Sequence, residues 1–118
     1  IPVVLKNRTV SEEASRMLAS LLEGVVANGS GSKAYIEGYK IGGKTGTAQK
    51  FENGSIAQGK YVSSFLGFFP SDAPQYLALV TVDEPQGAYY GSVVAAPAAK
   101  EIFQGIIDLK DIRPYGGT

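Results

Sequence analysis

Residues 42–49 of this chain read GGKTGTAQ, and the backbone conformation of this stretch decides the fold. The stretch contains one cation, two hydroxyls and three glycines. Lys44 supplies positive charge, and Thr45 and Thr47 supply hydroxyl donors. Gly46 lets another backbone approach closely. This combination suits an anion or a peptide carboxylate, so the flanking sequence has to show which of the two is bound.

Three interpretations of this stretch compete. In the first, Lys-Thr-Gly lies on a strand, as in the penicillin-recognising serine acyltransferases. In the second, Gly38 to Thr45 forms a phosphate-binding P-loop, because GYKIGGKT satisfies G-x-x-x-x-G-K-[ST] at every position. In the third, the stretch is a glycine-rich surface hairpin without chemistry. The neighbouring elements distinguish these possibilities.

Composition removes several kinds of chemistry. The 118 residues suit one domain, and 11 basic against 11 acidic side chains leave no net charge to attract nucleic acid or an anionic membrane. The chain has no cysteine and no histidine, so it lacks thiolate catalysis, disulfides, the usual general base and the commonest metal ligand. We therefore predict no metal, no cofactor and no nucleic-acid partner.

Two amphipathic segments predict helices. The first spans residues 11–28, where Ser11 can cap the N-terminus. Its apolar side chains recur at i, i+3, i+4 and i+7, namely Ala14, Met17, Leu18, Leu21, Leu22 and Val25. The second helix spans residues 96–109, has Pro97 in its first turn, and is expected to cover the sheet. The tail from Asp111 is expected to be loosely ordered.

Side-chain alternation predicts a strand near residues 38–50, and two further strands are predicted near residues 61–69 and 76–84. The run LALVTV at residues 77–82 is almost continuously apolar, which suggests burial on both faces. Only five residues, 70–74, join the second and third strands, so these strands pair antiparallel. The predicted fold is therefore α+β, an antiparallel sheet of about three strands covered by an N-terminal and a C-terminal helix.

Two polar segments are expected to be connections without chemistry. Residues 51–60 predict a mobile flap, with an Asn-Gly tight turn at 53–54. The run from Ser30 to Lys33 matches S-x-x-K, the pattern of a serine nucleophile and its lysine base. That motif needs the serine at the start of a buried helix, so that the lysine returns one turn later on the same side. Gly31 interrupts the motif, so we predict a polar turn.

The alternation of the first strand creates a difficulty for the site. It sends Lys44 to the opposite face from Thr45 and Thr47. All three side chains can serve one site only if this strand lies at an edge of the sheet, beside a groove. We therefore expect an edge strand.

The P-loop interpretation conflicts with these elements. Residues 77–84 do resemble the apolar strand that ends in an acid and holds magnesium in nucleotide-binding proteins. A P-loop, however, needs a helix that begins at its Lys-Thr pair, because the helix N-terminus and the loop amides cradle the phosphates. No apolar period of 3.6 residues occurs between Lys44 and Tyr61. P-loop nucleotide binding is therefore kept only as the alternative function.

Several blocks in one order resemble the C-terminal part of a class B penicillin-binding protein. The blocks are residues 38–49, SFLGFFP at 64–70, VDEP at 82–85, Tyr90-Gly91 and AAP at 95–97. They cover nearly the whole chain, so residues 1–118 are assigned to one transpeptidase domain. The resemblance is nearest to the monofunctional transpeptidases of septal and spore-cortex synthesis. It implies a larger serine acyltransferase fold of the β-lactamase/transpeptidase type.

The resemblance implies a DD-transpeptidase that cross-links peptidoglycan stem peptides through a serine acyl-enzyme and is acylated by β-lactam antibiotics. In such an enzyme Lys44 would hold positive charge beside the groups that shuttle protons. The Thr45 and Thr47 hydroxyls would bind the carboxylate of the donor, and the Thr47 N–H would form half of the oxyanion hole. Gly46 would let the donor peptide lie along the strand.

The sequence departs from this family in its nucleophile. It contains no S-x-N triplet, and its only S-x-x-K is the predicted turn at 30–33. We expect the chain alone to be inactive, with the other wall of the site supplied by N-terminal sequence or a second chain. The chain starts without methionine and has no run near the roughly 20 apolar residues of a membrane span. We expect a piece of a larger enzyme, anchored by absent N-terminal sequence at the outer face of the bacterial cytoplasmic membrane.

Overall fold

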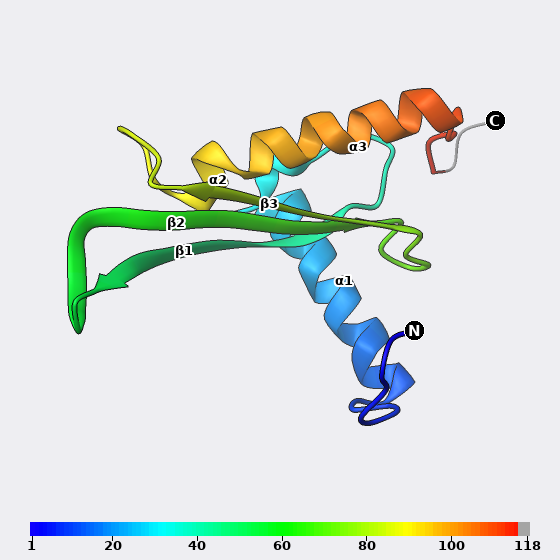
Figure 1. The fold of residues 1–118 in the computed structure, drawn as a ribbon. Helices are drawn as coiled ribbons and strands as arrows, with labels where there is room; N and C mark the ends of the chain where they lie inside the picture. Colours follow the sequence, from blue (N-terminus) through cyan, green and yellow to red (C-terminus); the bar gives the residue numbers. More distant parts are fainter. Residues whose placement is uncertain (116–118) are drawn as a thin grey trace.

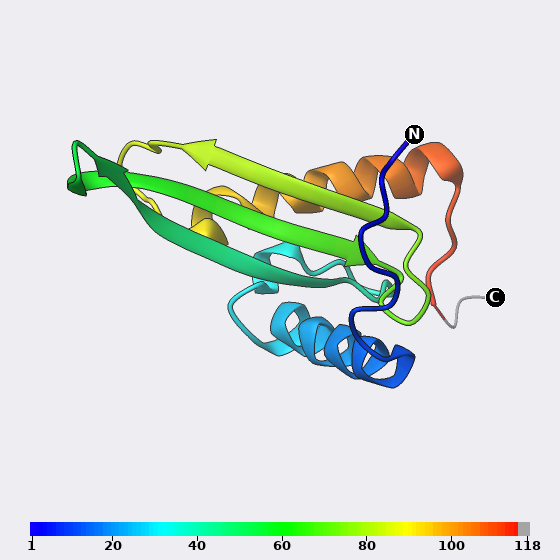
Figure 2. The ribbon, with the colours of Figure 1, turned by 60° about the horizontal axis from the view of Figure 1, so that its bottom comes forward.

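The computed structural model describes residues 1–115, and an antiparallel three-stranded sheet lies at its centre. The strands are β1 (Gly42–Glu52), β2 (Ser55–Phe69) and β3 (Tyr76–Asp83), in the spatial order β1-β2-β3. Figure 1 and Figure 2 show that the β1–β2 hairpin extends well beyond the helices at one end of the sheet. The predicted strands and their antiparallel pairing are confirmed, although β1 begins at Gly42 rather than near residue 38.

The flap predicted at residues 51–60 is wrong, because both strands continue through this segment. Phe51 pairs with Ile56, which leaves only Asn53 and Gly54 as the turn. Both turn residues have positive φ, 51° and 79°, as a two-residue hairpin turn of type I′ requires. The turn itself was therefore predicted correctly. The polar side chains belong to solvent-exposed strands and not to a loop.

Two helices lie on opposite sides of the sheet, α1 (Glu12–Asn28) and α3 (Ala96–Lys110) (Figure 1). The Ala14 N–H donates to the Ser11 hydroxyl at 3.0 Å, which caps α1 as predicted. A single-turn helix, α2 (Gly91–Val94), precedes α3 and was not predicted. The two predicted helices and the α+β fold class are confirmed.

The main core lies between α3 and the sheet. Phe65, Phe69 and Phe103 are 0–1% exposed, and the rings of Phe69 and Phe103 meet edge to face with 5.1 Å between their centroids. Gly67 permits this approach, since a Cβ at that position would lie 2.7 Å from the Phe103 ring. Burial of a phenylalanine side chain stabilises a fold by about 2–3 kcal/mol, so these three rings are its principal anchors.

A second apolar surface of the chain is exposed. Met17, Leu18 and Leu21 on α1 are 56–64% exposed, and Leu77 and Leu79 on β3 are 65–69% exposed. The prediction that β3 is buried on both faces is therefore wrong, because α3 covers one face only and burial alternates along the strand. We call these five residues the open apolar surface. A groove of about 420 Å³ runs between its two parts, with Leu18 and Leu77 in its lining.

Residues 111–115 pack against the segment that leads into β1, so the expected loosely ordered tail is wrong over this range. The Tyr39 hydroxyl donates to the Ile112 carbonyl at 2.6 Å. The Tyr115 N–H donates to the Gly38 carbonyl, also at 2.6 Å. The last three residues of the predicted tail lie outside the described residues. The C-terminal segment therefore braces the chain just before β1 begins.

Candidate active site

The predicted site residues lie on β1, at the edge of the sheet. Within residues 1–115, β1 pairs with β2 on one side only. Gly43 lies against the Phe65 ring, on the sheet face that α3 covers. Alternation places Thr45 and Thr47 on this same face and Lys44 on the opposite face. The structure therefore meets the edge condition under which the three side chains can serve one site.

The Lys44 side chain bends around this edge toward Thr45. Its Nζ donates to the Thr45 carbonyl at 2.9 Å and to Thr45 Oγ1 at 3.4 Å. The two side chains start on opposite faces of the strand, yet the length of the lysine lets its ammonium reach the neighbouring hydroxyl. A cation and a hydroxyl therefore lie together at the edge of β1.

The Thr45 carbonyl also shows which N–H and C=O groups of β1 point away from β2. Because β2 occupies one side of β1, a carbonyl that binds the Lys44 ammonium points to the outer edge. In an antiparallel pair, every second residue directs its N–H and C=O to the same side. The Thr47 N–H therefore points to the outer edge as well, where no other described strand pairs with it.

Thr47 and Ser63 are cross-strand partners, and each binds one end of residues 89–91. The Gly91 N–H donates to Thr47 Oγ1 at 3.0 Å. The fully buried Ser63 hydroxyl donates to the Tyr89 carbonyl. These two contacts hold residues 89–91, where α2 begins, against the middle of the β1–β2 pair.

Two glycines make this packing possible. A Cβ on Gly91 would lie 2.4 Å from the Ser64 carbonyl oxygen and 2.5 Å from the Gly46 carbonyl oxygen. A Cβ on Gly46 would lie 2.6 Å from Ser64 Oγ. The role predicted for Gly46 concerned only a bound peptide, and the structure adds a reason within the chain. Gly91, which was not among the predicted site residues, is constrained by backbone on both strands.

Three tyrosines stack beside this contact. The Tyr61 and Tyr89 rings are nearly parallel with centroids 4.0 Å apart, and the Tyr90 ring lies 4.6 Å from that of Tyr89. The hydrogen bond to Tyr90, followed by the charges that Tyr90 and Tyr61 carry when ionised, raises the pKa of Tyr89 to about 12. Tyr89 is therefore protonated at neutral pH and does not act as a general base. Tyr89 is half-buried in this stack, whereas Tyr90 is exposed.

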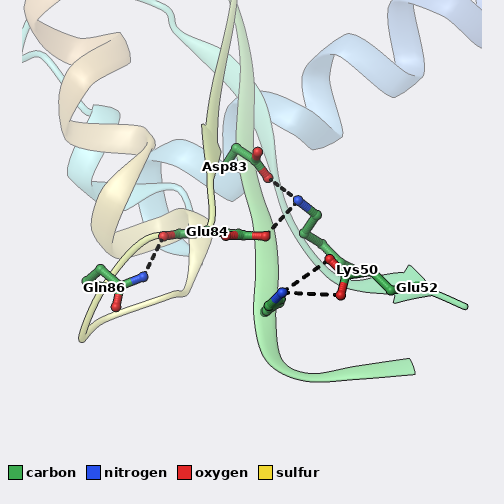
Figure 3. Close-up of polar contacts among 6 residues, drawn as sticks. Lys50, Glu52, Asp83, Glu84 and Gln86 are labelled. Atoms are coloured by element: carbon green, nitrogen blue, oxygen red, sulfur yellow. Dashed lines mark hydrogen bonds and ion pairs between the residues drawn. The ribbon is translucent and has the colours of Figure 1, made fainter. Parts of the chain in front are cut away.

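Lys50 connects β1 to the end of β3 (Figure 3). It lies where the pairing register shifts, between Gln49 and Phe51. Its Nζ is 3.1 Å from Asp83 Oδ1 and 2.9 Å from Glu84 Oε1. These hydrogen bonds, that to Glu84 first, raise the pKa of Lys50. Asp83 and Glu84 are thus ion-paired to the same lysine at the end of β3.

Two motifs with possible chemistry have the wrong geometry. No helix begins at Lys44 and Thr45, since both lie inside β1 and the described sheet is antiparallel. The P-loop interpretation is therefore wrong. Ser30 lies in a turn, and Lys33 lies in a 3-10 helix, η1 (Ser32–Ala34). The S-x-x-K match is a polar turn, as predicted.

The family of the chain follows from its sequence. The family model described as the penicillin binding protein transpeptidase domain matches residues 2–104. This chain belongs to that family. The strand of this chain that carries Lys44, Thr45 and Gly46 is β1, and the three-stranded sheet with its two helices belongs to a transpeptidase domain.

Curated relatives of this transpeptidase chain are much longer. A peptidoglycan D,D-transpeptidase FtsI homolog of Chlorokybus atmophyticus is 43% identical over 110 residues, which cover 92% of this chain and 16% of the relative. Stage V sporulation protein D of Bacillus subtilis (strain 168) is 40% identical over 112 residues, which cover 94% of this chain and 17% of the relative. The chain therefore spans about a sixth of the length of these relatives.

Solved structures of transpeptidase domains share the fold. The apo transpeptidase domain of penicillin-binding protein 3 from Burkholderia pseudomallei superposes with a TM-score of 0.81 at 33% identity, over 92% of this chain and 33% of that chain. Penicillin-binding protein 3 from Mycobacterium tuberculosis, solved with ampicillin, superposes with a TM-score of 0.79 at 25% identity, over 93% and 27% of the respective chains. The likeness therefore extends over more than nine-tenths of this chain.

The predicted site residues lie together on β1, but the groups that contact this strand were not predicted. Ser63, Gly91, Tyr61 and Lys50 were not predicted as part of the site. Only the block Tyr90-Gly91 gave a signal, and it indicated a family resemblance but no contact with β1.

Among residues 1–115, no helix is long and apolar enough to cross a membrane.

Proposed function

We propose that this chain, residues 1–118, is the C-terminal portion of one transpeptidase domain and that β1 forms one wall of its active site. The observation behind this proposal is the set of polar groups at the outer edge of β1. The Lys44 ammonium lies against Thr45 there, and the Thr47 N–H points the same way. Positive charge, hydroxyls and a backbone donor at one strand edge suit a peptide that ends in a carboxylate.

The proposed reaction is peptidoglycan DD-transpeptidation. A serine outside this chain attacks the carbonyl carbon of the penultimate D-Ala, and the terminal D-Ala leaves as the free amino acid. The amine of a neighbouring stem peptide then displaces the serine and completes the cross-link. Membership of the transpeptidase family and relatives named peptidoglycan D,D-transpeptidases support this assignment.

Each predicted site residue then has a defined role. Lys44 holds positive charge near the proton-transfer groups, and the Thr47 N–H stabilises the oxyanion that forms at the attacked carbonyl. One donor of this kind is worth about 3 kcal/mol in comparable enzymes. The Thr45 and Thr47 hydroxyls bind the terminal carboxylate. Gly46 leaves the strand surface low enough for the donor peptide to lie along it.

The proposed partner of the chain is the N-terminal remainder of the transpeptidase domain, from the same protein or a second chain. It would supply the serine and its lysine, since the chain has neither S-x-N nor an S-x-x-K in helical register. It would also cover the open apolar surface, whose five large side chains are 56–69% exposed. Sequence outside the chain would anchor the enzyme at the outer face of the cytoplasmic membrane, where stem peptides are cross-linked.

β-Lactam binding by the complete enzyme is part of the same proposal. A penicillin carries a carboxylate and a reactive carbonyl, as the donor peptide does, so both can use the edge of β1. The Mycobacterium tuberculosis structure with ampicillin supports this extension.

The test is acylation of the full-length protein by a fluorescent penicillin. Lys44→Ala should lower the acylation rate strongly, because it removes a cation from a site that favours negative oxygen. Lys60→Ala is the matched control, since Lys60 pairs with Glu52 near the hairpin turn. Equal rates for wild type and Lys44→Ala would refute the assignment of the site.

A further inference from the structure

The contact between Gly91 and Thr47 determines how the Thr47 hydroxyl can be used. A threonine hydroxyl has one proton to donate and two lone pairs to accept with. The Gly91 N–H occupies one lone pair at 3.0 Å. An N–H cannot accept, so the hydroxyl proton has to be directed at some other acceptor. Because Thr47 is exposed, that acceptor can be a ligand.

Donation from the Gly91 N–H also strengthens the hydroxyl as a donor. Hydrogen bonds in a chain polarise one another, so a hydroxyl that accepts from an N–H becomes a better donor to an anion. A ligand carboxylate has no proton to give at neutral pH and can only accept. The arrangement N–H to hydroxyl to carboxylate therefore has a donor and an acceptor at every step.

The position of Gly91 is fixed by its neighbours. Any Cβ there would lie within 2.5 Å of the Ser64 and Gly46 carbonyl oxygens, closer than real side chains approach backbone. The Ser63 hydroxyl holds the other end of the same segment through the Tyr89 carbonyl. The segment at residues 89–91 can therefore keep its N–H on Thr47 only with glycine at 91.

We propose that Gly91 and Ser63 are positioning residues of the carboxylate site: they hold the Gly91 N–H on Thr47 Oγ1 and so make the Thr47 hydroxyl a dedicated donor to the ligand carboxylate. This inference rests on the proposed function. In this arrangement neither Gly91 nor Ser63 touches the ligand. Both act through Thr47, and their loss should resemble the loss of the Thr47 hydroxyl.

The experiment measures acylation rate constants of the full-length protein with benzylpenicillin and with its methyl ester. Thr47→Val should slow the acid more than the ester by about tenfold or more, the range of a hydrogen bond to a charged group. Gly91→Ala and Ser63→Ala should change the acid-to-ester ratio in the same direction. Combining Gly91→Ala with Thr47→Val should change the ratio no further, because both act through one hydroxyl. Gly105→Ala in α3 is the control, since a Cβ there meets nothing within 4 Å.

The possible outcomes distinguish a failure of this inference from a failure of the proposed function. If Thr47→Val changes the ratio while Gly91→Ala and Ser63→Ala slow both compounds equally, the two residues are merely structural and the inference is overturned. If Thr47→Val slows both compounds equally, the carboxylate role is wrong and the inference falls with it. If Gly91→Ala does not fold, Ser63→Ala decides alone, because it introduces no clash and removes only the donor to Tyr89.

Discussion

The Nζ atom of Lys50 lies 2.9 Å from Oε1 of Glu84, so a side chain of β1 binds the residue that follows β3. Because β2 lies between these strands, the contact spans the width of the sheet. The Glu84 N–H donates to the Tyr61 carbonyl at 2.8 Å. The start of the loop at residues 84–90 is therefore fixed both by its backbone and by its side chain.

We expect Lys50→Met to lower the melting temperature of the full-length protein. The methionine keeps an apolar stem but removes the charge that binds Asp83 and Glu84. The folded pKa of Lys50 is raised above 10.5 by these hydrogen bonds, so the stabilisation is fully present below pH 10.5 and is lost as pH rises through the folded pKa. Melting curves at pH 7 and pH 11 check this, with the exposed lysine variant Lys100→Met as control. A difference from wild type that stays constant across this range would contradict the ion-pair explanation.

Phe103→Ala should destabilise the protein by about 3–5 kcal/mol, because it leaves a cavity where the ring meets Phe69 and Gly67. The neighbouring Ile102 is 45% exposed, and Ile102→Ala should cost much less. Denaturant unfolding of both variants measures the difference. Similar losses for the two would mean that α3 does not pack on the sheet as described.

Local patterns predicted the fold where the signal is contained in neighbouring residues. The helix at 11–28, the helix near 96–109 and the Asn-Gly turn were read correctly for this reason. The burial of a helix or strand could not be predicted in this way, since it depends on which other parts of the protein cover its faces. Met17, Leu18 and Leu21 belong to the predicted apolar face of α1, yet they are exposed among the described residues, as are Leu77 and Leu79 of β3. No periodicity in the chain could show this.

Only the part of the candidate site on β1 could be predicted from the sequence. Its residues are close in sequence, so Lys44, Thr45 and Thr47 could be placed together. A simple hairpin register from the Asn-Gly turn would pair Thr47 with Lys60, whereas the structure pairs it with Ser63. The shift arises where one residue of β1 opposes four residues of β2, at 57–60. The supporting contacts therefore depended on an irregularity that the sequence pattern did not reveal.

Leu77→Thr and Leu79→Thr should destabilise the full-length protein by about 1–2 kcal/mol each, because the proposed N-terminal remainder covers the open apolar surface. Threonine favours strands as leucine does or better, so the loss reports burial and not strand propensity. Leu109→Thr on α3 is the control, since Leu109 is 84% exposed and lies outside this surface. Chemical denaturation gives the three values. Stabilities indistinguishable from wild type for Leu77→Thr and Leu79→Thr would show that nothing covers β3.

Ser30 should take no part in acylation, although it begins the only S-x-x-K in the chain. It lies in a turn, and Lys33 lies in the short η1, so the lysine does not return one helical turn later onto the same side. The isolated 118 residues should therefore remain unlabelled by a fluorescent penicillin. In the full-length protein, Ser30→Ala should be acylated at the wild-type rate. Mass spectrometry of the labelled protein locates the adduct, and an adduct on Ser30 would show that this serine is the nucleophile.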